Sequence, residues 1–160
     1  MKEITKFIKE GGLKITSKTK VNKYNYHPKT KEELQDLLKQ LIEERGNEGD
    51  FNDIDTSKIT DMSGLFDNID NDNRDKFNGD ISNWDVSNVT DMYSIFYGCK
   101  SFNRSLAKWK VFNVTNMEFM FYECESFNQP LTDWDVSNVI YTSFMFENCP
   151  IEEKYKPNFK

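Results

Sequence analysis

The sequence predicts an α/β repeat solenoid, in which short strands and short helices form a stack under an N-terminal helical cap. A stretch of about 25 residues occurs three times at fixed spacing, and a period of roughly 20–50 residues is typical of stacked repeats. One such copy is too short to bury its own apolar residues, so each copy must pack on its neighbours. The full copies are residues 77–101, 102–126 and 127–150.

The copies carry the same side chains at the same positions. Each begins with Phe-Asn and continues with an aliphatic residue, a Trp, a Phe and a Cys. These positions are Phe77, Phe102 and Phe127; Ile81, Leu106 and Leu131; Trp84, Trp109 and Trp134; Phe96, Phe121 and Phe146; and Cys99, Cys124 and Cys149. We interpret them as the buried frame of the stack.

Within each copy, the first half predicts a short strand and the second half a short helix. In the first full copy, the strand is expected around Ile81, between residues that favour turns. From Val89 to Cys99 the apolar residues are mostly three positions apart, which is the spacing of one helix face. Ser87 or Asn88 is the expected N-cap of this helix.

The motif WDVSNVTDMYSIFYGCKSFN at residues 84–103 resembles the BspA-like leucine-rich-repeat family of bacterial proteins. The resemblance extends over residues 53–150. It implies a leucine-rich-repeat-like solenoid and a binding role, and it implies no particular partner.

Residues 1–46 are predicted to be an N-terminal segment that ends in a capping helix. Thr30 and Glu33 have the spacing of a capping box, in which each side chain bonds the backbone near the other. Gly46 is the expected end of the helix. Its buried face is expected to comprise Leu34, Leu37, Leu38, Leu41 and Ile42.

The solenoid is expected to span residues 47–150. Residues 53–69 are interpreted as a truncated repeat, because their apolar residues match the second half of a full copy. Residues 70–76 form an insertion relative to the later copies and are expected to loop out. Residues 151–160 no longer fit the repeat and are the expected C-terminal cap.

The chain has 160 residues and a formal net charge of −6. Residues 1–31 carry nine Lys against two Glu, whereas residues 50–91 carry eleven Asp against three basic residues. An acidic repeat region repels the phosphates of nucleic acid and suits a basic protein surface. We therefore expect a protein partner and no direct binding of nucleic acid.

The sequence shows neither a secretory leader nor an apolar stretch that could span a membrane. This pattern predicts a cytoplasmic protein. A surface or secreted location would apply if a signal peptide had been removed.

Residues suited to catalysis or metal binding are few. His27 is the only histidine and lies outside the repeats, so a nucleophilic Ser or Cys has no evident base. Cys99, Cys124 and Cys149 lack Cys-x-x-Cys spacing, and we expect reduced, buried thiols rather than a zinc site. Residues 67–75 are rich in oxygen ligands but lack the Gly and Glu positions of an EF-hand, which favours a solvated loop over a weak calcium site. We expect no enzyme activity and no cofactor.

Candidate partner-binding residues are those at which the copies differ. One group lies on the expected concave, strand-bearing surface: Asp80, Ser82, Asn83, Arg104, Ser105, Lys108, Gln129, Thr132 and Asp133. The second group consists of aromatic residues at outward positions: Phe112, Phe119, Tyr141 and Phe144.

The end of a stack needs a cover, and the C-terminal tail is expected to supply it. We expect Ile151, Tyr155 and Phe159 of the tail to cover the second group, with Phe112 and Phe119 the residues that the tail reaches least. The alternative is an exposed apolar patch, which marks an interaction site.

These features predict a non-catalytic protein-binding module that is monomeric or weakly self-associating. The favoured role is a cytoplasmic inhibitor or adaptor that occludes its partner, for example a mobile-element or phage inhibitor of a host defence enzyme such as a nuclease. The alternatives are a surface-exposed adhesin-type repeat protein and a calcium-binding surface module.

Overall fold

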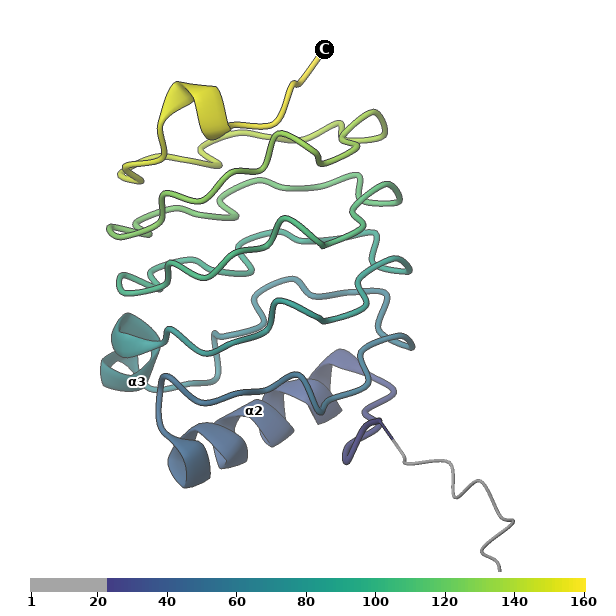
Figure 1. Cartoon of the computed structure of the whole chain (residues 1–160), viewed down its shortest axis with the longest axis vertical. Helices are drawn as coiled ribbons and strands as arrows, with labels where there is room; N and C mark the ends of the chain where they lie inside the picture. The colour runs from purple at the N-terminus through teal and green to yellow at the C-terminus, as the bar shows by residue number, and fades with distance from the viewer. Residues whose placement is uncertain (1–22) are drawn as a thin grey trace, which may run out of the picture.

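The computed structural model describes residues 23–160, which form a stack of coils between a long helix and the C-terminal tail (Figure 1). The part of the expected N-terminal segment before residue 23 lies outside the described residues. We name the coils in chain order: coil 1 is residues 47–76, coil 2 is residues 77–101, coil 3 is residues 102–126 and coil 4 is residues 127–150.

Helix α2 (Lys31–Arg45) lies against coil 1 at the N-terminal end of the stack (Figure 1). The predicted helix between Thr30 and Gly46 is therefore present. The Thr30 hydroxyl accepts a hydrogen bond from the Glu33 N–H at 3.2 Å, and the Glu33 carboxylate accepts one from the Lys29 N–H at 2.7 Å. Its buried face comprises Leu34, Leu38, Leu41 and Ile42. No helix in the described part of the chain is long and apolar enough to cross a membrane.

The prediction of an α/β repeat solenoid is wrong, because the full copies contain neither helix nor sheet. The other helices of residues 23–160 are α3 (Asn71–Lys76) and the 3-10 helix η1 (Glu153–Tyr155), and both lie outside the full copies. Coils 2 to 4 are paired through isolated parallel bridges, Asp91 with Asn116 and Asn116 with Tyr141. Each copy is thus a series of turns.

The apolar spacing that suggests a helix arises instead from successive turns. In coil 2 the Ile95 N–H donates to the Met92 carbonyl and the Cys99 N–H to the Phe96 carbonyl, each three residues back. Ser94, at φ 50°, and Gly98, at φ 69°, adopt the left-handed conformation, which a right-handed helix cannot contain. Turns of three residues repeat the apolar spacing of a helix without its continuous hydrogen bonding.

The interior of the stack is built from columns of identical aromatic side chains. Phe77, Phe102 and Phe127 stack with ring centroids 6.0 and 5.9 Å apart. Trp84 and Trp109 stack at 6.3 Å with their planes 7° apart. Each repeat Trp also donates its indole N–H to a carbonyl of the preceding coil, to Phe51, Ile81 and Leu106 respectively. The shared residues are therefore both the apolar core and the connection between coils.

The register of the stack begins before the segment interpreted as a truncated repeat. Asp50 forms a parallel bridge with Asp80, and the Trp84 indole bonds the Phe51 carbonyl, so Phe51 takes the place that Ile81 has in coil 2. The inserted residues 70–76 contain α3, whose N-cap is Asp70.

Arg45, at the end of α2, joins this helix to coil 1. Its guanidinium donates to the Asp53 carboxylate at 2.7 and 3.1 Å and to the Asp50 carbonyl at 2.7 Å. The hydrogen bond from Arg45 holds the pKa of Asp53 below its usual 3.8.

We expect the stability of the chain to fall on acidification below about pH 4. Because the pKa of Asp53 is lower when folded than when unfolded, its contribution is complete above the unfolded value and is lost as the pH falls through the folded one. Urea unfolding from pH 7 to pH 2 should show a shallower acid loss for Asp53→Asn than for the parent chain. Parallel curves would contradict this role of Arg45.

Candidate binding surfaces

One face of the stack carries a group of contacting aromatic side chains. We call it the ladder face and define it as the outward side chains of residues 90–99, 115–124 and 140–149. Tyr97 stacks on Tyr122 at 5.0 Å between ring centroids, and Phe119 stacks on Phe144 at 5.2 Å. Tyr93 and Tyr122 both contact Phe119, at 5.7 and 5.6 Å.

Two of these aromatic residues have an unfavourable backbone conformation. Phe119 and Phe144 have φ values of 55° and 56°, at the position where coil 1 has Gly64 and coil 2 has Ser94. A bulky side chain in this left-handed region costs about 1–2 kcal/mol. The backbone at this position favours glycine, so the two phenylalanines are not explained by the backbone. Such strain is a reason to look for a binding role.

Within its three segments the ladder face carries charges of one sign, whereas Lys156 of the tail lies over Phe146 and Arg74 of α3 lies near Gly98. Its three segments contain Asp91, Glu118, Glu123 and Glu147 and no Lys or Arg. Desolvation raises the pKa of the Tyr122 phenol, and the neighbouring Glu123 carboxylate adds to this effect. The face thus combines the negative faces of aromatic rings with carboxylates.

The expected cover by the C-terminal tail is wrong for the aromatic candidates. Phe112, Tyr141 and Phe144 are 41%, 54% and 59% exposed, while Phe119 is half-buried between its aromatic neighbours. The Tyr155 carbonyl of the tail accepts a hydrogen bond from the Leu131 N–H, which is on another side of coil 4.

The structure brings together three of the four aromatic candidates and separates the fourth. Phe119, Tyr141 and Phe144 belong to the ladder face. Phe112 lies between Val111 and Asn113, at the position where coils 2 and 4 have Ser87 and Ser137. Tyr93, Tyr97 and Tyr122 were not among the predicted candidates, although coil 4 has Ser143 and Glu147 at these two repeat positions. Tyr122 follows Phe119 by three residues and Tyr97 follows Tyr93 by four, so helical spacing would also have placed these pairs on one face, and this was the signal that could have identified them.

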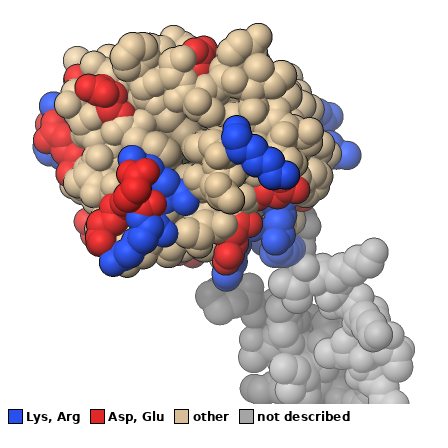
Figure 2. Space-filling view, turned by 90° about the horizontal axis from the view of Figure 1, so that it is seen from above, with Lys and Arg blue, Asp and Glu red and all other residues tan. Residues whose placement is uncertain are grey.

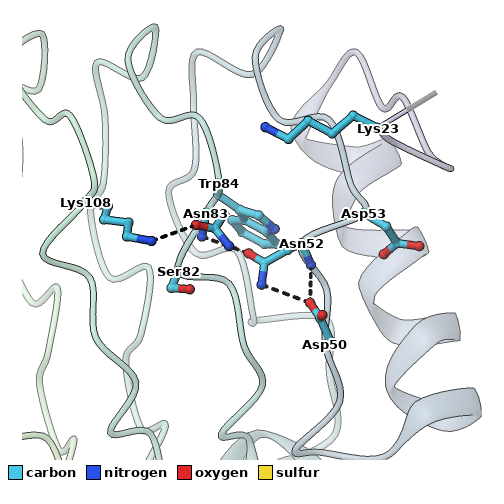
Figure 3. Close-up of a pocket in the computed structure, with 8 residues that line it drawn as sticks. All are labelled: Lys23, Asp50, Asn52, Asp53, Ser82, Asn83, Trp84 and Lys108. Atoms are coloured by element: carbon cyan, nitrogen blue, oxygen red, sulfur yellow. Dashed lines mark hydrogen bonds between the residues drawn. The ribbon is translucent and has the colours of Figure 1, made fainter. Parts of the chain in front are cut away.

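The polar candidates lie on a different face, which contains no strand. Near coil 1 this face has an open hollow of about 650 Å³, lined by Lys23, Asp50, Asn52, Asp53, Ser82, Asn83, Trp84 and Lys108 (Figure 3). Lys108 donates to the Asn83 side chain at 3.3 Å, and the Asn83 N–H donates to the Asn52 side chain at 2.8 Å. Several polar groups here bond one another, which leaves few of them to orient a ligand.

The remaining polar candidates also have structural contacts or lie singly in solvent. The Asp80 carboxylate accepts from the Ser82 N–H at 3.0 Å, and the Ser105 hydroxyl accepts from the Ala107 N–H at 3.4 Å. Arg104 donates to the Asn78 carbonyl, and Gln129 donates to the Asn103 side chain. Thr132 and Asp133 are exposed.

His27 lies near a carboxylate and a serine, but not in the order that nucleophilic catalysis needs. His27 Nδ1 is 3.1 Å from Asp55 Oδ2, and the Ser57 hydroxyl donates directly to Asp55 Oδ1 at 2.6 Å. A triad requires the histidine between the serine and the carboxylate. The same Ser to Asp bond recurs at Ser87 and Ser137, each at 2.6 Å, where no histidine is present. This bond is a turn element of the coils.

The acidic segment 67–75 uses its oxygen atoms in local contacts. Asp70 accepts from the Asn73 N–H at 3.0 Å as the N-cap of α3, and Asp72 pairs with Lys76 at 2.8 Å. Within residues 23–160, no group of three His, Cys, Asp or Glu side chains is placed to hold a metal ion.

The three cysteines are free, and their burial decreases toward the C-terminus. Cys99 and Cys124 are buried, whereas Cys149 is half-buried. Burial raises the pKa of all three thiols, and the Cys124 thiol also donates to the Phe96 carbonyl at 3.0 Å.

We expect a thiol reagent to modify Cys149 first in the folded chain, because the thiolate is the reactive form and solvent reaches Cys149 most easily. Cys99 and Cys124 should react at the rate of global or local unfolding. Mass spectrometry of timed samples, with Cys149→Ser as the control, measures the order. Simultaneous reaction of all three thiols before unfolding would contradict the structure.

A family model described as "Mycoplasma protein of unknown function, DUF285" matches residues 34–158. The match includes most of α2, all four coils and most of the tail. No curated protein and no solved structure matches the chain.

Proposed function

The chain belongs to the family described as Mycoplasma protein of unknown function, DUF285, and we propose that it is a non-catalytic module that binds a basic protein surface through its ladder face. The observation that carries the proposal is the exposed aromatic group, with Phe119 and Phe144 strained, beside carboxylates and without a basic residue in the same three segments. The motif at residues 84–103 supports a closer relation to the BspA-like leucine-rich-repeat proteins, with the binding role that this relation implies.

The ladder face offers two attractions for a cationic side chain. A Lys or Arg placed over an aromatic ring gains about 0.5–1 kcal/mol at an exposed site. The carboxylates of Glu123 and Glu147 lie on neighbouring coils beside Tyr122 and add long-range attraction, which raises the association rate and selects basic partners. Exposed aromatic rings also provide apolar contact area, and they are typical of interface centres.

A basic partner surface fits the inhibitor or adaptor role. Proteins that bind nucleic acid carry Lys and Arg where phosphates dock. A face of carboxylates and aromatic rings competes for such a surface, because it offers both negative charge and flat rings. We propose a cytoplasmic inhibitor of this kind, with a nucleic-acid-processing enzyme such as a defence nuclease as the partner class.

The test uses two synthetic peptides that differ only at their charged positions. One has Arg at every second position, and the other has Glu at those positions. NMR titration should show that the Arg peptide shifts the signals of Tyr93, Tyr97 and Tyr122, and that its affinity falls as salt is added.

Matched variants locate the binding. Tyr97→Ser combined with Tyr122→Ser should weaken binding of the Arg peptide about tenfold. Phe112→Ser removes an exposed aromatic residue from another part of the coil and should leave the affinity unchanged. Equal binding of the Glu peptide, or equal loss with Phe112→Ser, would overturn the proposal.

A further inference from the structure

The ladder face contains a regular row of backbone hydrogen bonds between coils. In coil 2, four alternate residues donate their N–H groups to carbonyls of coil 3 at 2.9 to 3.0 Å: Met92 to Asn116, Ser94 to Glu118, Phe96 to Met120 and Gly98 to Tyr122. In coil 3, the equivalent four donate to coil 4 at 2.8 to 3.0 Å: Met117 to Tyr141, Phe119 to Ser143, Phe121 to Met145 and Glu123 to Glu147.

The equivalent row in coil 4 is open. It consists of the N–H groups of Thr142, Phe144, Phe146 and Asn148, and none of them forms a hydrogen bond with a group of residues 23–160. The carbonyls of Thr142, Phe144 and Phe146 already accept bonds from N–H groups three residues ahead. Among the described residues, this edge of coil 4 therefore offers free N–H donors and almost no free carbonyl acceptors.

Space for another segment exists beside this row. A hollow of about 610 Å³ lies between coil 4 and the tail, and it is lined by Thr142, Phe144, Met145, Phe146 and Glu147 of coil 4 and by Glu153, Lys156, Pro157, Asn158 and Phe159 of the tail. A second hollow of about 280 Å³ shares Thr142, Asn158 and Phe159 with it and extends to Trp134. Most of the surface seen from this end of the stack belongs to uncharged residues (Figure 2).

We propose that this edge binds an extended segment of another protein, which continues the row of backbone hydrogen bonds beyond coil 4. The segment runs parallel to coil 4, and four of its alternate carbonyl oxygens accept hydrogen bonds from Thr142, Phe144, Phe146 and Asn148. This is strand addition, in which backbone bonds give affinity and side-chain pockets give specificity.

The equivalent segments of coils 3 and 4 indicate which side chains the bound segment should carry. The residue that offers the third carbonyl is Met120 in coil 3 and Met145 in coil 4, both buried, and a phenylalanine follows each. Phe121 stacks on Phe146 at 5.6 Å, and the Lys156 ammonium lies over the Phe146 ring at 5.6 Å from its centroid. An aromatic residue after the third carbonyl would take the place of Lys156 on Phe146.

A second copy of this chain does not fit the edge. Two copies related by a two-fold axis would bring one donor row against another, which forms no hydrogen bonds. Head-to-tail stacking needs the opposite end of the stack, at coil 1, where α2 already lies: Gln35 donates to the Gly64 carbonyl at 2.9 Å, and Lys31 donates to the side chains of Asp61 and Ser63 at 3.0 and 2.9 Å. The occupant is therefore a segment of a different protein.

This inference is independent of the proposed basic partner, because it rests on backbone donors rather than on the charges of the ladder face. The probe is a peptide with the sequence of residues 115–124, capped at both ends, with Ser in place of Cys124. It carries the four coil 3 carbonyls that accept hydrogen bonds from the N–H row of coil 2, together with the Met-Phe pair of coil 3. The control peptide has Ser in place of both Met120 and Phe121.

Amide hydrogen exchange of the full chain gives the direct readout. In the free protein, the amides of Thr142, Phe144, Phe146 and Asn148 should exchange faster than those of Phe119 and Phe121. With the probe at ten times its dissociation constant, the four should exchange about tenfold more slowly. The control peptide should protect them much less at the same concentration.

Two further results bear on the occupant and on the location. Tyr97→Ser combined with Tyr122→Ser should leave protection by the probe unchanged, although it weakens the Arg peptide. If the probe protects consecutive amides rather than the alternate amides of Thr142, Phe144, Phe146 and Asn148, or amides elsewhere in the chain, the proposed binding edge is wrong. If sedimentation shows a dimer, and the same four amides are already protected in it without the probe, the occupant is a second copy of this chain rather than a segment of another protein.

Discussion

Replacing Trp109 by alanine is expected to lower the free energy of unfolding by about 3–5 kcal/mol. Trp109 is 2% exposed, stacks on Trp84 and lies 5.9 Å from Phe96 between ring centroids. Its indole N–H also donates to the buried Ile81 carbonyl at 3.1 Å. The change leaves a cavity between coils 2 and 3 and a carbonyl without its donor. A loss of this size is a large fraction of the stability of an ordinary domain.

Urea unfolding followed by circular dichroism measures this loss. Trp109→Phe is the matched control, because it keeps a ring in the column and removes the indole N–H. It should cost clearly less than the alanine variant. A Trp109→Ala protein that melts within a degree or two of the parent would show that the aromatic column does not hold the coils together.

The residues of the core could be predicted from the sequence, whereas the backbone that carries them could not. Trp109 recurs at a fixed interval, and a large apolar residue that recurs in this way must be buried between neighbours. The apolar spacing after Val89 has two physical solutions, one helix or a run of three-residue turns. The left-handed residues decide between them, and Ser94 and Phe119 are not residue types that reveal a positive φ.

The candidate site was predictable in the same partial way. The departures of Phe119, Tyr141 and Phe144 from the repeat identified three of the six outward aromatic residues of the ladder face, since side chains that the frame does not require are free to serve binding. The exposure of Phe144 was not predictable, because the tail makes its backbone bond at Leu131 and leaves this ring 59% exposed. The open row of N–H donors in coil 4 could not be predicted either, because the predicted helix would have satisfied those N–H groups with its own carbonyls.

The second large effect is expected at Gly79, where Gly79→Ala should cost about 1–3 kcal/mol. A Cβ atom at this position would lie 2.4 and 2.7 Å from two ring carbons of Phe51 and 2.8 Å from one of Phe77. Both rings are fully buried, so neither can move into solvent. The glycine makes room for Phe51, which is larger than the Ile81 and Leu106 of the later coils.

The equivalent positions in the later coils support this explanation. Coils 3 and 4 have Arg104 and Gln129 at the place of Gly79, where the coil below contributes Ile81 and Leu106 instead of a phenylalanine. The cost of Gly79→Ala should therefore depend on Phe51. In a Phe51→Leu background, which removes the ring responsible for the two closest contacts, the alanine should cost at least about 1 kcal/mol less. Unfolding free energies of the four proteins in this cycle measure the coupling, and strictly additive losses would show that Phe51 is not the reason for the glycine.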